Sequence, residues 1–202
     1  MDTSDIKALL IPLLKKWWCS LLLLPFIIYS LHQAYWTLRF NIFFSVTYET
    51  PFPVNFIHFM LDNFLLIVHE AGHTFFSVFG VRTITILGGS LFEVLLPVII
   101  LAFFWVNKKK IGIQLSLYMV GFAFLQVAFY AADGGARQLP LIGGLSKESH
   151  DWYNLLSGWG MLENDLTIGV LLTITGGLCY LAALTVPLYF KKYDEVKLDL
   201  EV

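Results

Sequence analysis

The sequence predicts an all-α polytopic membrane protein with about five transmembrane helices and a short re-entrant or strand-like segment near residues 83–89. Three observations support this fold class. Hydrophobic residues make up 57% of the 202 residues, charged residues make up only 14%, and the mean hydropathy is +0.71. A soluble domain carries about 25% charged residues to cover its surface. The composition therefore excludes a soluble enzyme.

Other protein classes are excluded by simple counts. The 18 Phe, 9 Tyr and 6 Trp rule out intrinsic disorder, and two Cys are too few for a disulfide scaffold. A net charge of −2 gives no reason to expect nucleic acid as a partner. We therefore expect a single membrane domain over residues 1–202, with the lipid bilayer as its surroundings.

Five apolar segments predict the helices. Residues 18–36 follow Lys15 and Lys16 without a small-residue cleavage site behind them, which predicts an uncleaved N-terminal anchor helix. The other four expected helices cover residues 56–79, 91–106, 111–132 and 166–190. Between the second and third, β-branched residues alternate over residues 83–86 before Gly88 and Gly89, which favours a strand or re-entrant piece.

The second expected helix contains the sequence His69-Glu70-Ala71-Gly72-His73, an H-E-x-x-H motif. Residues four apart lie on one helix face, so His69 and His73 can hold one Zn²⁺ together. Glu70 can then act as the general base toward a water at that metal. An ionisable residue at the bilayer centre costs about 2.5–3.5 kcal/mol. The three groups therefore face a metal, a cavity or, on the alternative reading, a polar helix–helix contact.

A catalytic zinc site needs a third protein ligand. Among the remaining acids and histidines, Asp133 ranks first because it stands beside two glycines that permit close approach. His150 and Asp151 are close alternatives, and Glu93 stays possible. Asp62 lies seven residues before His69, about 10 Å along the helix axis. That distance is too long for direct ligation. Asp62 could line the path by which water enters, but we favour a position near the membrane interface.

The segment "LLIVHEAGHTFFSVFG" in an apolar helix resembles the site-2 protease group, the M50 intramembrane metallopeptidases, and looks most like the compact M50B-like members. The resemblance implies that His69 and His73 are zinc ligands, that Glu70 is the base, and that Asp133-Gly134-Gly135 is the later Asp-Gly motif. It also implies a metallopeptidase core over residues 56–190, in which "VRTITILGG" is similar to the strand-like segment that presents substrate.

The expected function is zinc-dependent endopeptidase activity, within the membrane, toward membrane-anchored protein substrates. Two other readings stay open. A catalytically inactive M50-like membrane protein could bind clients or act as a partner subunit. A metal transporter could use the same histidines, but the third to fifth expected helices carry almost no ionisable residue beyond Glu93.

Overall fold

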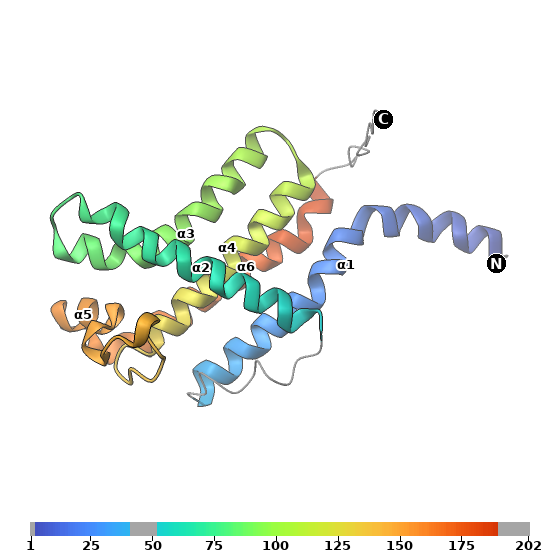
Figure 1. Cartoon of the computed structure of the whole chain (residues 1–202). Coiled ribbons are helices and arrows are strands. Elements are labelled where there is room, and N and C mark those ends of the chain that lie inside the picture. Colours follow the sequence, from blue (N-terminus) through green and yellow to red (C-terminus); the bar gives the residue numbers. More distant parts are fainter. Residues whose placement is uncertain (1–2, 41–51, 190–202) are drawn as a thin grey trace.

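Helices form nearly all of the part of the chain that this computed structural model describes, residues 3–40 and 52–189 (Figure 1). No strand occurs among these residues. The elements are α1 (Thr3–Phe40), α2 (Val54–Ser77), α3 (Arg82–Val106), α4 (Lys110–Ala132), α5 (Asp151–Gly158) and α6 (Asp165–Tyr189), with short 3₁₀ turns at Ile142–Gly144, Lys147–Ser149 and Leu162–Asn164. The all-α prediction is confirmed over this part of the chain.

Four segments are long and apolar enough to cross a membrane, and they indicate a membrane protein. They are Leu10–Phe40, Arg82–Val106, Lys110–Ala132 and Leu162–Tyr189. The expected anchor at 18–36 lies inside α1, which begins much earlier, at Thr3, and ends slightly later, at Phe40. Phe190, where the last helix was expected to end, lies outside the described residues.

The helix with the H-E-x-x-H motif, α2, is 24 residues long but is not one of these four segments. It carries two acids and three histidines among its apolar residues, and these groups reduce its hydropathy. The count of five membrane-spanning helices therefore stays a prediction, with α2 as the fifth.

Residues 83–89 are not a strand: they form the first two turns of α3. The Thr85 N–H donates to the Val81 carbonyl at 2.9 Å, the spacing of an α-helix. A helix satisfies every backbone group within one segment, which an apolar environment demands more strongly than β-branched side chains favour a strand. Gly88 and Gly89 do not break the helix, and both are buried against α2.

The bundle is organised around α4, which packs along α6 and also contacts α3 and α1. The α4–α6 contact depends on glycines. A Cβ on Gly121 would stand 2.7 Å from the Tyr180 ring and 2.9 Å from the Gly176 carbonyl oxygen. Close helix contacts through small residues are typical of membrane proteins.

The short helix α5 follows the loop after α4 and lies against the N-terminal half of α3 (Figure 1). The Trp152 indole N–H donates to the Ser90 hydroxyl at 3.0 Å, and both side chains are buried. This contact holds the start of α5 next to α2 and α3, where the motif lies.

Candidate metal centre

His69 and His73 lie one turn apart on the face of α2 that turns inward, as the motif predicts. Their ring centroids are 4.8 Å apart. The His69 side chain is 7% exposed and the His73 side chain 23% exposed. Both imidazoles are thus directed into the molecule and away from its outer surface.

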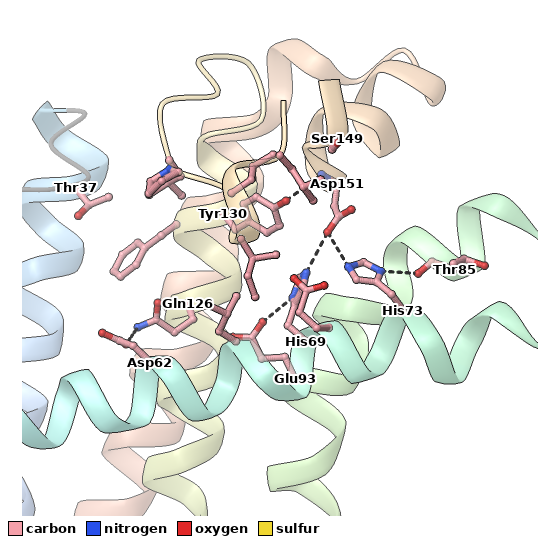
Figure 2. Close-up of a pocket in the computed structure, with 18 of the residues that line it drawn as sticks. Thr37, Asp62, His69, His73, Thr85, Glu93, Gln126, Tyr130, Ser149 and Asp151 are labelled. Atoms are coloured by element: carbon pink, nitrogen blue, oxygen red, sulfur yellow. Dashed lines mark hydrogen bonds and ion pairs between the residues drawn. The ribbon is translucent and has the colours of Figure 1, made fainter. Parts of the chain in front are cut away.

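The third group at this position is Asp151, the first residue of α5. Its Oδ2 atom lies 3.0 Å from Nε2 of His69 and 3.0 Å from Nε2 of His73 (Figure 2). These three residues form a group whose ligand atoms all lie within 4.8 Å of one another. Two imidazole nitrogens and one carboxylate oxygen are a donor set that suits Zn²⁺.

Each histidine is oriented by an oxygen at its other ring nitrogen. Nδ1 of His69 lies 3.1 Å from the buried carboxylate of Glu93, and Nδ1 of His73 lies 2.9 Å from the Thr85 carbonyl (Figure 2). Since a carbonyl oxygen can only accept, Nδ1 of His73 carries the proton. Such partners fix the tautomer of metal-binding histidines and leave Nε2 free to ligate.

This arrangement fits a cation between the three residues. With protons on both Nδ1 atoms, the two neutral imidazoles present lone pairs at Nε2 toward an anionic oxygen. Without an ion, protons at Nε2 of His69 and His73 would instead donate to the Asp151 carboxylate: burial raises the pKa of that carboxyl, but these two hydrogen bonds outweigh burial and hold the pKa below its usual value. Three acceptor atoms converge on one point, and a bound metal ion would satisfy all three.

Gly89 on α3 leaves the space that such an ion requires. A Cβ on this residue would stand 2.6 Å from Nε2 of His69 and 2.6 Å from Nε2 of His73. Close approach of α2 and α3 brings Gly89 there: a Cβ on Gly72 would collide with the Gly88 carbonyl oxygen. Only a residue without a side chain keeps both ligand atoms accessible.

The candidate metal centre opens onto a cavity of about 550 Å³. Four acids line it, namely Asp62, Glu70, Glu93 and Asp151, and no Lys or Arg is among its described lining residues. Glu70 is half-buried and borders the cavity together with both histidines. Residues of α1 and the apolar loop 139–145 form other parts of the wall.

The structure does not bring Asp133 or His150 to the motif histidines. Both are fully buried, and they contact each other, with Nε2 of His150 3.2 Å from Oδ2 of Asp133. The Asp133 carboxylate also accepts the backbone N–H groups of Gln138 and Leu139 at 2.7 and 2.8 Å. Its oxygens are engaged by the loop that follows α4, so Asp151 takes the place at the histidines for which Asp133 ranked first.

Two other acids, Glu93 and Asp62, lie in places that the sequence did not favour. Glu93 contacts Nδ1 of His69, so it orients a candidate ligand and is not grouped with the ligand atoms themselves. Asp62 accepts a hydrogen bond of 2.7 Å from Gln126 and lines the cavity. The pair Gly88-Gly89 was the available signal for a close helix contact. Nothing in the sequence indicates that the carbonyl of Thr85 meets His73.

Comparisons with protein-family models, with curated proteins and with solved structures found no match to this chain.

Proposed function

We propose that the chain is a zinc-dependent endopeptidase, embedded in a membrane with several helices crossing it, that hydrolyses peptide bonds of membrane-anchored substrates. The observation that carries the proposal is the convergence of His69, His73 and Asp151 with Glu70 beside them in one cavity. The contacts at Nδ1 of both histidines also support the proposal, because metal-binding histidines typically have such an oxygen partner at the ring nitrogen that does not bind the metal.

His69, His73 and Asp151 would hold the metal, which supplies Lewis-acid activation of water and of the scissile carbonyl. Glu70 would accept a proton from the attacking water. When the bond between the carbonyl carbon and the amide nitrogen breaks, Glu70 would return that proton to the leaving nitrogen. The four carboxylates in the cavity lining would let it admit the water that the reaction consumes.

The substrate segment would reach the cavity in an extended form. A helix has its backbone groups bonded internally, so its peptide bonds are exposed to attack only after local unwinding. Residues 83–89 are helical and offer no free strand edge for pairing with such a segment. The cavity wall from α1 and loop 139–145 would therefore contact the unwound chain.

Zinc content and cleavage of a membrane-anchored reporter, both measured on the full chain in detergent, test the proposal. We expect stoichiometric zinc in the wild-type protein. Glu70→Gln should retain zinc and lose about 10²–10⁴-fold in cleavage rate. Glu163→Gln makes the same chemical change at an exposed residue outside the cavity lining and should cleave at the wild-type rate.

Two results would refute the proposal. A Glu70→Gln protein that cleaves as fast as wild type would remove the assigned base. Wild-type protein without zinc, together with a cellular phenotype that survives His69→Ala, would favour the non-enzymatic client-binding reading.

A further inference from the structure

The buried pair Asp133–His150 lies behind the candidate metal centre and is not used in the proposed reaction. Both side chains have no exposed surface. A buried carboxylate next to a buried imidazole is costly unless every polar atom has a partner. The partners of these two side chains therefore indicate what the pair does.

Asp133 organises the start of the loop that leads from α4 to α5. Its Oδ1 accepts from the N–H of Gln138 at 2.7 Å, and its Oδ2 accepts from the N–H of Leu139 at 2.8 Å. Its backbone carbonyl accepts from the Arg137 N–H at 2.7 Å. One carboxylate thus fixes the first turn of this loop to the C-terminal end of α4.

His150 connects that turn to α5. Its Nδ1 accepts from the N–H of Tyr153 at 3.3 Å, so His150 is the N-cap of α5 and its Nδ1 carries no proton. The proton of the neutral ring is then on Nε2, which donates to Oδ2 of Asp133 at 3.2 Å. One imidazole joins the N-terminus of α5 to the carboxylate at the end of α4.

The next residue after His150 is Asp151, whose carboxylate meets both motif histidines. The N–H of Asp151 donates to the Tyr130 hydroxyl at 3.0 Å, and the Tyr130 ring lies 4.3 Å from the His150 ring. The backbone of Asp151 is therefore fixed from α4 by two neighbouring contacts, one through Asp133 and His150 and one through Tyr130.

We propose that Asp133 and His150 are positioning residues that place the Asp151 carboxylate for metal binding. This inference rests on the proposed metal centre. The pair joins the end of α4 to the start of α5, whereas the main helix contacts of the bundle are those of α4 with α6 and of α2 with α3. Loss of the pair should therefore lower metal affinity strongly and lower the stability of the metal-free protein against unfolding only slightly.

Two substitutions of His150 separate the two contacts of its ring. His150→Gln can present a donor near the position of Nε2 and keep the contact to Asp133. His150→Asn can accept the Tyr153 N–H near the position of Nδ1 and keep the helix cap, but it is too short to reach Asp133. Asp133→Asn removes the charge from the other partner, and Asp165→Asn is the matched control.

Asp165 suits this purpose because its Oδ2 also accepts a loop N–H, that of Gly135, at 2.9 Å. It has no contact with His150 or Asp151 among the interactions of the described residues. The same Asp-to-Asn change at position 165 thus reports how much general loosening of the loop matters.

The measurement is Zn²⁺ affinity of the full-length protein in detergent by competition with a chelating dye, supported by the visible absorption spectrum of the Co²⁺-loaded protein. We expect His150→Asn and Asp133→Asn to weaken Zn²⁺ binding by about 10–100-fold and to change the Co²⁺ spectrum. The Zn²⁺ affinity of His150→Gln and of Asp165→Asn should stay within about 3-fold of the wild-type value. This is well below the loss of about 10–100-fold that follows when a metal ligand loses its hydrogen-bond partner.

Several results would overturn the inference. Wild-type affinity in both His150→Asn and Asp133→Asn would show that the pair does not place Asp151. A loss in His150→Gln but not in His150→Asn would assign the effect to the helix cap. A loss in His150→Gln as large as that in His150→Asn would show that the contact to Asp133 does not by itself place Asp151, and an equal loss in Asp165→Asn would assign the effect to the loop. A metal-free His150→Asn protein that unfolds far below metal-free wild type would make the pair a stabilising contact only. The proposed function fails separately, if wild-type protein binds no Zn²⁺.

Discussion

Gly89→Ala should abolish metal binding while leaving the helical bundle folded. The added Cβ would stand 2.6 Å from Nε2 of each motif histidine, whereas ordinary contacts begin at 3.4 Å. Each imidazole would therefore have to retreat by about 0.8 Å, the difference between these two distances. Zinc–nitrogen bonds tolerate deviations of only about 0.2 Å. Both ligands would leave bonding range, and we expect Zn²⁺ affinity to fall by more than roughly 100-fold. That loss exceeds the usual effect of removing a hydrogen-bond partner from a metal-binding histidine.

Zn²⁺ competition titrations and thermal unfolding, with and without metal, test this prediction. Gly177→Ala is the matched control, because a Cβ on Gly177 of α6 meets nothing within 4 Å. It should bind Zn²⁺ as wild type does. Metal-free Gly89→Ala should unfold close to metal-free wild type, since its clash is with side chains that can turn away once no ion is bound. Near-wild-type affinity in Gly89→Ala would refute the reasoning, because the ion would then not lie between the histidines.

Further predictions concern the surroundings of the centre and the bundle. Glu93→Gln should weaken Zn²⁺ binding by about 10–100-fold, because the amide is a poorer partner for Nδ1 of His69; wild-type affinity in a titration would contradict it. Trp152→Phe should lower the free energy of unfolding by about 1 kcal/mol through loss of the bond to Ser90, as a denaturant titration would detect. Removal of metal by a chelator should lower the unfolding temperature, and excess Zn²⁺ at 100 times Kd should restore about 2.7 kcal/mol. Gly176→Val should destabilise the bundle with or without metal, since its Cβ would stand 2.8 Å from the Gly121 carbonyl oxygen; unchanged metal-free melting would argue against close α4–α6 packing.

Local features of this chain could be predicted from the sequence because they depend on near neighbours. The helical placement of the motif, with His69 and His73 on one face, follows from the helical repeat alone. The long apolar runs likewise predict the helices without any knowledge of their packing. The alternation of residues 83–86 is also a local signal, but it favoured a strand where the surroundings favour a helix.

The third residue at the histidines could not be ranked correctly from sequence, because it depends on how a loop folds. Asp133 and Asp151 are both acids at the ends of the same polar stretch, and both were candidates. The difference lies in backbone N–H groups of the loop, which occupy the Asp133 carboxylate and leave that of Asp151 for the histidines. No pattern of residue types specifies those bonds. The outer contact of His73 is to a backbone carbonyl, which every residue has, so it too leaves no trace in the sequence.

The central position of α4 has a consequence for how the protein is made. Of the four candidate spans it is by far the most enclosed by protein, and its buried Gln114 donates to the Ser20 hydroxyl of α1 at 2.6 Å. Its most extensive contact is with α6, which follows all the other helices in the described part of the chain. All three residues of the candidate metal centre precede residue 152, yet the scaffold beneath them is incomplete until α6 has emerged. A nascent chain that stops before α6 would expose α4 to lipid and should be recognised by membrane quality control.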